Sequence, residues 1–198
     1  MNLPNKLTMF RIFITLVIVA LLGINWSLFN INWPIFLLGG KVILRLNYLI
    51  AGALFAIASI TDMLDGKIAR KKGMVTDFGK TLDAIADKVL VNATLVVLAY
   101  NRDIALILPL IVITRDVIVD SIKTISGAKG KVIGASQSGK IKTVFMMFGI
   151  TICLFENLPM EFFGIALDQL LIIIAVCLSI YSGIEYYLNN KELFADAK

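Results

Sequence analysis

The sequence contains no histidine, and this absence removes the side chain that most often carries protons in enzymes at neutral pH. It also excludes histidine-based catalysts and the usual zinc centres. Only two cysteines are present, Cys153 and Cys177. Both lie inside apolar runs, so we interpret them as packing residues without a disulfide or a metal. Any proton transfer or metal binding must therefore use Asp, Glu, Lys, Arg, Tyr or Cys.

Polar sequence is also scarce, because apolar residues make up 59% of the 198-residue chain and its mean hydropathy is +0.87. Apolar runs near the length that a bilayer-spanning helix needs, about 20 residues, recur along the chain. Too little polar sequence remains to coat a soluble globule. We therefore predict an all-α integral membrane protein with a single domain, residues 1–198. The six predicted transmembrane helices are 8–24, 46–66, 80–100, 104–123, 141–156 and 165–187.

Two segments outside these spans have compositions typical of a membrane boundary. The stretch NLPNKLTMFR, residues 2–11, is predicted to form a short N-terminal interfacial helix that leads into the first span. No small-residue cleavage site follows that span, so we do not interpret it as a signal peptide. Residues 25–41 contain Trp26, Trp33 and two glycines, a composition that predicts an aromatic interfacial loop.

Lysine and arginine are distributed unequally between the two sides of the predicted bundle. They gather before the first span, between spans two and three, and between spans four and five, whereas the other side has only Lys41, Arg45 and Arg102. Basic loops remain in the cytoplasm during membrane insertion. Both termini and the two basic loops are therefore predicted to be cytoplasmic.

Four aspartates occur where the second span ends and the third begins. Asp62 and Asp65 are three residues apart, and Asp83 and Asp87 are four apart, so each pair occupies one helix face. The short loop at 71–78 predicts antiparallel neighbouring helices, on which the four carboxylates converge. Ionised carboxylates in a small volume repel one another. Hard divalent cations such as Mg²⁺ or Mn²⁺ relieve this repulsion, so we predict two such ions, an arrangement suited to phosphoryl chemistry.

Two other interpretations of the aspartates remain open from their spacing. They could be solvated residues at the ends of spans, or they could line an ion or proton pathway. The small residues Gly66, Ala69 and Gly79, one turn from the acids, favour a ligand whose phosphates approach the backbone closely. Arg70 and its basic neighbours also favour a phosphate-bearing ligand.

The pattern Asp62-x2-Asp65-Gly66-x2-Ala69-Arg70-x8-Gly79-x3-Asp83-x3-Asp87 resembles the signature of the CDP-alcohol phosphotransferases. Its eight fixed positions within 26 residues make it far more specific than a lone glycine motif. The resemblance implies that family's fold, which has six transmembrane helices and usually forms a homodimer. It also implies transfer of a phosphatidyl-type group from a CDP-linked lipid to an alcohol.

The resemblance further implies individual roles for these positions. Asp62, Asp65 and Asp83 correspond to metal ligands, and Asp87 corresponds to a metal ligand that also accepts a proton. Arg70 would bind the diphosphate of the CDP-lipid with its guanidinium fork. The other expected contacts of the motif region with the CDP-lipid are Asp65, Gly66, Ala69, Thr76 and Gly79.

The N-terminal stretch is similar to that of bacterial family members whose acceptor is glycerol 3-phosphate. Pro4, Asn5, Thr8 and Arg11 are the matching positions, and the similarity implies that Asn5 and Thr8 help to hold cytidine. Alternatively, Thr8 caps the first helix and Arg11 anchors it at the membrane interface.

Basic residues in and after the fourth span are similar to the same subfamily. Those expected to form an anion pocket for the phosphate of the acceptor are Arg115, Lys123, Lys140 and Lys142. The alternatives are an ion pair of Arg115 with Asp116 or Asp120, and lysines that attract lipid head groups. The chain departs from the subfamily at Lys123, where arginine is usual; lysine keeps the charge without the bidentate fork.

The resemblance as a whole implies transfer from CDP-diacylglycerol to glycerol 3-phosphate at the cytoplasmic face of a bacterial cell membrane. The expected partners are these two substrates, the surrounding lipids and a second copy of the chain, and no nucleic acid is expected. Two alternatives stay open. One is a sister CDP-diacylglycerol transferase that uses inositol phosphate or serine, and the other is a cation transporter with an acidic site.

Overall fold

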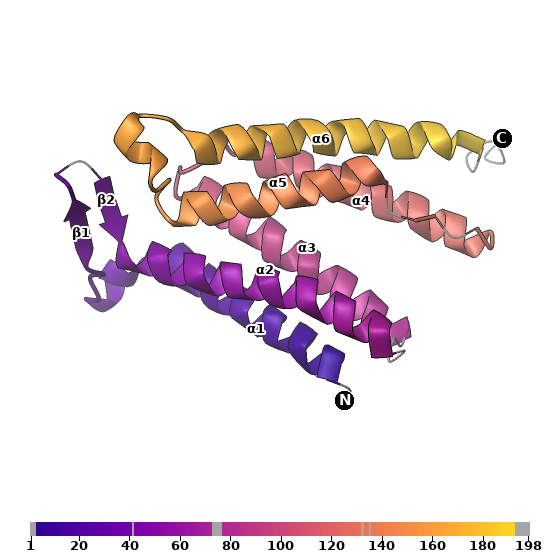
Figure 1. The fold of residues 1–198 in the computed structure, drawn as a ribbon, viewed down its shortest axis with the longest axis horizontal. Coiled ribbons are helices and arrows are strands. Elements are labelled where there is room, and N and C mark those ends of the chain that lie inside the picture. Colours follow the sequence, from indigo (N-terminus) through magenta and orange to yellow (C-terminus); the bar gives the residue numbers. More distant parts are fainter. Residues whose placement is uncertain (1–2, 41, 73–76, 132, 135, 193–198) are drawn as a thin grey trace.

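Six long helices account for most of the computed structural model (Figure 1). It describes residues 3–40, 42–72, 77–131, 133–134 and 136–192, without the side chains of 3–5, 63–72, 77–78 and 80. The helices are α1 (Leu3–Gly23), α2 (Leu46–Lys72), α3 (Asp77–Tyr100), α4 (Ile107–Ala128), α5 (Gln137–Leu154) and α6 (Leu167–Asn189). Each of them overlaps one of the six apolar segments predicted from the sequence, although their bounds differ, most at the end of α2, which reaches Lys72 instead of residue 66.

The predicted N-terminal interfacial helix is not a separate element in the structure. α1 runs without interruption from Leu3 to Gly23, so the polar residues 5, 6, 8 and 11 belong to the same helix as the apolar run. Pro4 does not break the helix because the first turn has no backbone hydrogen bonds to lose.

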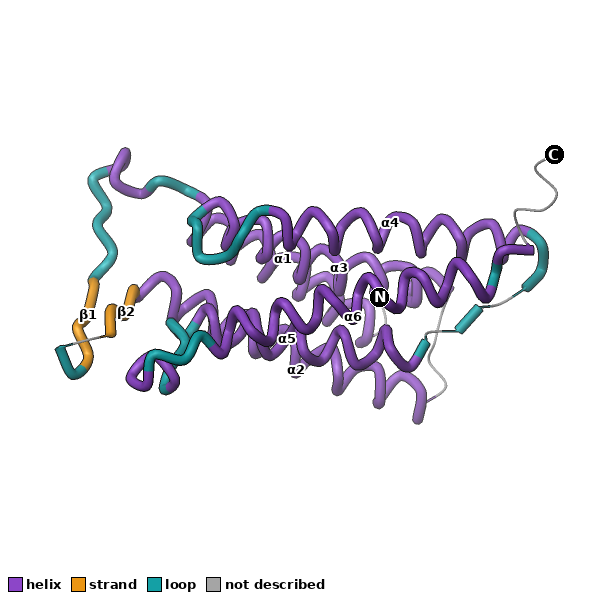
Figure 2. Tube along the Cα trace, turned by 90° about the horizontal axis from the view of Figure 1, so that it is seen from above, coloured by secondary structure: helices purple, strands orange, loops and turns teal. Residues whose placement is uncertain are grey.

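The helices pack in two groups of three. α1 packs on α2 and α3, and α6 packs on α4 and α5, while contacts of α2 and α3 with α4 and α5 join the groups. Figures 1 and 2 show that α2 and α4 end, and α3 and α5 begin, at one end of the bundle, where α1 also begins and α6 also ends. We call this the polar end. The described helix ends that lead to the termini and to the two basic segments therefore share one end of the fold.

Two helices are long and apolar enough to cross a membrane among the residues that the structure describes, at Lys6–Gly23 and Leu167–Asn189. The apolar part of α2, Leu46–Asp62, is shorter. Large apolar side chains cover much of the outer surface, including Phe13 and Leu16, each 62% exposed. Soluble proteins rarely expose apolar patches of this extent, so the fold indicates a membrane protein.

A β-hairpin occupies part of the segment that the sequence predicted as a loop. β1 (Ile35–Leu38) pairs with β2 (Val42–Arg45) in antiparallel register, with Ile35 opposite Arg45. Gly39 and Gly40 between the strands have φ angles of 61° and 70°, which glycine adopts without steric cost. Trp26–Phe29 before the hairpin and Met160–Phe163 before α6 form short 3-10 helices, η1 and η2.

Arg45 fixes this hairpin to the rest of the bundle. It donates hydrogen bonds to both carboxylate oxygens of Glu156, at 2.6 and 3.0 Å, and to Asp103 at 3.0 Å. Its guanidinium also lies 3.4 Å from the centre of the Tyr48 ring. Burial lowers the pKa of Arg45, but the hydrogen bonds to Glu156 and Asp103 outweigh it and raise the pKa above its ordinary value.

α5 and α6 approach closely because α5 carries a glycine at their contact. A Cβ atom on Gly149 would lie 2.8 Å from Ile172 Cγ1 and 3.1 Å from the Ile172 backbone nitrogen. Small residues of this kind allow helices in membranes to pack backbone to backbone. Ile150 and Leu154 continue the buried core on the same helix.

Candidate functional site

Three of the four predicted aspartates have described side chains, and they lie toward the polar end. Asp62 is on α2, whereas Asp83 and Asp87 are on α3. One oxygen of Asp62 and one of Asp83 lie 2.5 and 3.1 Å from the same nitrogen, Nη1 of Arg11 on α1. The structure therefore brings carboxylates from two helices together on a cation from a third.

Arg11 is the most buried charged side chain described, with only 1% of its surface exposed. Its Nε and Nη2 atoms are buried without a hydrogen-bond partner among the described residues. The interpretation of Arg11 as an interfacial anchor is therefore wrong, since an anchor extends its charge into water. A signal existed in the sequence, because Thr8, Arg11 and Thr15 recur at helical spacing and all three are buried.

Thr8 lies well inside α1, so the alternative that it caps the first helix is also wrong. The helix begins at Leu3, six residues before Met9, which would be its first residue if Thr8 were the cap. Thr8 is 4% exposed and occupies the same face of α1 as Arg11. This face points toward α2 and α3, against which α1 packs.

Asp87 lies within electrostatic range of four other charged groups. It interacts electrostatically with Asp62, Asp83, Arg11 and Lys142. Its Oδ1 atom is buried and has no hydrogen-bond partner among the described residues. A buried carboxylate oxygen without a donor is costly, so this atom is suited to a proton or a cation that the described side chains do not supply.

The described carboxylates have the type of oxygen donor that a divalent ion binds. No three described side chains, however, are close enough together to form a metal-binding group. Asp62 and Asp83 present hard oxygen donors on one shared cation, and Asp87 presents an unpaired oxygen. Mg²⁺ and Mn²⁺ prefer such donors.

Several predicted site residues lie outside the described side chains. For Asn5, Asp65, Gly66, Ala69 and Arg70 the structure gives the helical backbone only. Thr76 lies outside the described residues altogether. Gly79 is half-buried in the first turn of α3. The roles predicted for these positions stay predictions.

Two of the predicted acceptor-binding cations, Arg115 and Lys142, meet at a buried carboxylate between α4 and α5. Lys142 donates a hydrogen bond of 3.0 Å to Asp116 Oδ1, and Arg115 donates one of 3.1 Å to the same oxygen. Asp116 and Lys142 are 8% and 7% exposed. The pair of Arg115 with Asp116, one of the alternatives from the sequence, is thus present, but two cations share one anion and positive charge remains.

α6 helps to position Arg115. The guanidinium donates to the backbone oxygen of Ser179 at 3.2 Å and to the Ser182 hydroxyl at 2.7 Å. The side chain crosses α6 at Gly183, where a Cβ atom would lie 3.0 Å from Arg115 Cγ. The absence of a side chain at Gly183 therefore gives Arg115 its path.

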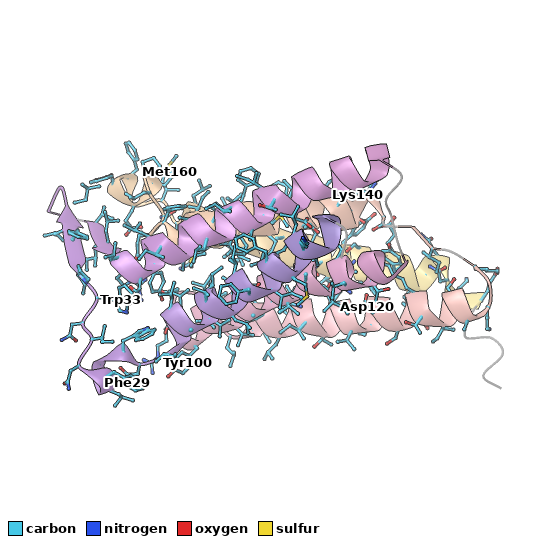
Figure 3. The ribbon with its side chains drawn as sticks, turned by 90° about the horizontal axis from the view of Figure 1, so that it is seen from below. Phe29, Trp33, Tyr100, Asp120, Lys140 and Met160 are labelled. Atoms are coloured by element: carbon cyan, nitrogen blue, oxygen red, sulfur yellow. The ribbon has the colours of Figure 1, made fainter. Side chains whose placement is uncertain are left out.

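The other two predicted acceptor-binding lysines differ in their surroundings. Lys123 is exposed, and its Nζ lies 5.4 Å from the centre of the Tyr186 ring, which Arg115 approaches to 5.9 Å. Lys140 is exposed at the start of α5, and Figure 3 shows it with Asp120 on the part of the bundle away from Phe29 and Trp33. Asp120 pairs with Lys88 of α3 instead of Arg115.

An electrostatic interaction links the carboxylates of the first helix group to the cations of the second. Lys142 on α5 interacts electrostatically with Asp87 on α3 as well as with Asp116 on α4. The polar end therefore has carboxylates on α2 and α3 within electrostatic range of a buried cation on α5. Such a site suits a ligand that carries both metal-bound and protein-bound phosphates.

The fold and the site together define a helical membrane protein with a charged site toward one end of its bundle. Residues 1–181 match the family described as CDP-alcohol phosphatidyltransferase. The chain therefore belongs to this family.

Relatives from several bacteria are similar over nearly the whole chain. A protein of Bacillus subtilis is 34% identical over 193 residues, which cover 96% of each chain. One from Rickettsia bellii is 32% identical over 98% of this chain and 97% of its own, and one from Mycoplasma genitalium is 35% identical over 95% and 83%. All three are named CDP-diacylglycerol–glycerol-3-phosphate 3-phosphatidyltransferase.

Proposed function

We propose that this chain is a transferase that moves the phosphatidyl group of CDP-diacylglycerol to glycerol 3-phosphate, giving phosphatidylglycerophosphate and CMP. The observation that carries the proposal is the name shared by relatives at 32–35% identity over at least 95% of the chain. The buried cations beside Asp87 support it, because an acceptor that carries its own phosphate needs positive charge near the reacting hydroxyl.

The proposal includes two divalent ions, Mg²⁺ or Mn²⁺. Asp62, Asp65, Asp83 and Asp87 would hold them, and bound there they would neutralise charge that develops on the diphosphate. The convergence of Asp62 and Asp83 on Arg11 and the unpaired Oδ1 of Asp87 support this donor set.

Asp87 is the proposed catalytic base. Its carboxylate accepts the proton of the acceptor hydroxyl while the hydroxyl oxygen bonds to the phosphorus that carries diacylglycerol. The bond from that phosphorus to the bridging oxygen of the diphosphate breaks, and CMP leaves in a single displacement. The unpaired Oδ1 atom of Asp87 is available for that proton.

The CDP-lipid is proposed to lie along α2 and the start of α3. Arg70 binds its diphosphate, since a guanidinium fork matches phosphate oxygens. Thr8 supports an extension of this site to α1, because it is buried on the face of Arg11. The remaining proposed contacts are Asn5, Asp65, Gly66, Ala69, Thr76 and Gly79.

The phosphate of glycerol 3-phosphate is proposed to bind at Arg115 and Lys142. These side chains come from different helices and share Asp116, which leaves net positive charge next to Asp87. Lys123 and Lys140, both exposed, are proposed to add positive charge at the entrance to this phosphate site.

In the membrane, the six helices are proposed to form six spans, with the polar end and both termini in the cytoplasm of a bacterial cell and the protein in a homodimer. The excess of lysine and arginine in the polar-end segments supports this orientation. The apolar outer surface of α1 and α6 supports contact with lipid chains.

The acceptor is tested with purified full-length protein, CDP-diacylglycerol and radiolabelled glycerol 3-phosphate. The expected product is labelled phosphatidylglycerophosphate, with CMP released in equal amount. Parallel reactions contain labelled inositol phosphate or serine. Product with either of these and none with glycerol 3-phosphate would assign the chain to a sister activity.

A further inference from the structure

Arg11 is a buried cation placed where the carboxylates need a positive charge. A single atom, Nη1, contacts Asp62 of α2 at 2.5 Å and Asp83 of α3 at 3.1 Å. Without a cation these two carboxylates would repel each other and would also repel Asp87. Arg11 therefore stabilises the meeting of α1, α2 and α3 at the polar end.

The pairing is nevertheless incomplete. Nε and Nη2 of Arg11 are buried without a partner among the described residues, so the guanidinium forms with the described carboxylates no two-pronged contact of the kind that makes arginine–carboxylate pairs strong. A partly satisfied buried network loses much of its stabilising effect to desolvation. A cation that binds Asp62 and Asp83 more strongly than Arg11 does can therefore displace Arg11 from them.

A divalent ion would compete for the same oxygens. An ion bound by Asp62 and Asp83 would occupy the position that faces Arg11 Nη1, and its two positive charges would repel the guanidinium.

We propose that Arg11 is the internal counter-cation of the aspartate cluster, which holds Asp62 and Asp83 together before metal binds and is displaced from them when metal enters. This inference rests on the metal-binding part of the proposed function. Arg11 is a positioning residue in this scheme, and it sets the affinity of the site for metal by competing with it.

The test measures Mn²⁺ binding and thermal unfolding of the detergent-solubilised full-length protein, without substrates. Arg11→Gln is expected to lower the unfolding temperature in chelator and to tighten Mn²⁺ binding by about tenfold, because a competing charge is removed. Arg11→Lys keeps the charge, so its Mn²⁺ affinity is expected to stay within about threefold of wild type.

Arg45→Gln is the matched control, because Arg45 also joins three segments through two carboxylates but lies at the hairpin. It is expected to lower the unfolding temperature without changing Mn²⁺ affinity. Weaker or unchanged Mn²⁺ binding by Arg11→Gln would overturn the inference. If Arg11→Gln does not fold, a tenfold change in the Mn²⁺ affinity of Arg11→Lys would overturn it instead. Wild-type protein that binds no Mn²⁺ would contradict the metal proposal itself.

Discussion

At the scale of single residues, the site depends on charges that are buried beside opposite charges. Arg11 and Lys142, 1% and 7% exposed, each lie next to an aspartate from another helix. Removing one partner from such a pair leaves the other charge buried and uncompensated. Substitutions here change both stability and function, so each variant needs a readout that separates the two.

Asp87→Asn tests the proposed base. The amide has the shape of the carboxylate but cannot accept the proton, so the transfer rate is expected to fall by about 10²- to 10⁴-fold. Binding of CDP-diacylglycerol to the purified variant is expected to survive largely unchanged, which shows that the site is intact. Near-normal transfer by this variant would exclude Asp87 as the base.

Lys142→Gln tests the proposed acceptor site. The KM for glycerol 3-phosphate is expected to rise by roughly tenfold or more, since a charge-assisted contact to phosphate is lost. The KM for CDP-diacylglycerol is expected to change little. Lys191→Gln is the control. It removes the same charge as Lys142→Gln, but from an exposed position just after α6. Equal effects of the two substitutions would contradict a specific role for Lys142.

Residue-scale prediction from the sequence succeeded where helical spacing carried the information. Asp62, Asp83 and Asp87 were placed together because spacing and a short loop determine which helix faces meet. The position of Arg11 was missed because the spacing of Thr8, Arg11 and Thr15 shows that they share one helix face, but not whether that face points into water or into the bundle. Only the packing of α1 against α2 and α3 decides this.

At the scale of helices and strands, close packing of α5 on α6 keeps Lys142 and Arg115 in place. Lys142 is on α5, and the backbone of α6 binds Arg115 through Ser179. Gly149 sets the distance between these helices, since a Cβ there would lie 2.8 Å from Ile172.

Gly149→Ala is expected to destabilise the protein by about 1–3 kcal/mol, because the added methyl group forces the helices apart. The measurement is thermal or denaturant unfolding in detergent. Gly127→Ala is the matched control on α4, where an added Cβ meets no atom within 4 Å. It is expected to be neutral or slightly stabilising. Equal losses in both variants would contradict the packing argument.

The helices were predictable because apolar runs of span length have few alternatives, whereas the hairpin was not. β1 and β2 are only four residues long, and the two glycines between them favour a loop as much as a turn. The contact that holds the hairpin in place joins Arg45 to Glu156, 111 residues away, and no local sequence pattern predicts it.

At the scale of the whole molecule, both helix groups contribute charged side chains to one end. α2 and α3 supply carboxylates around Arg11 of α1, while α4 and α5 supply cations around Asp116, and Asp87 and Lys142 interact across the boundary. The asymmetry of lysine and arginine in the sequence predicted this polar end. Which charges meet within it depended on the packing of the two groups, which the sequence pattern does not specify.

The most direct test of the account is turnover with and without divalent metal. Full-length enzyme treated with a chelator and supplied with CDP-diacylglycerol and glycerol 3-phosphate is expected to release no CMP. Addition of excess Mg²⁺ or Mn²⁺ is expected to restore the reaction. Full turnover by protein shown to contain no bound metal would contradict the central claim that the aspartates act through divalent ions.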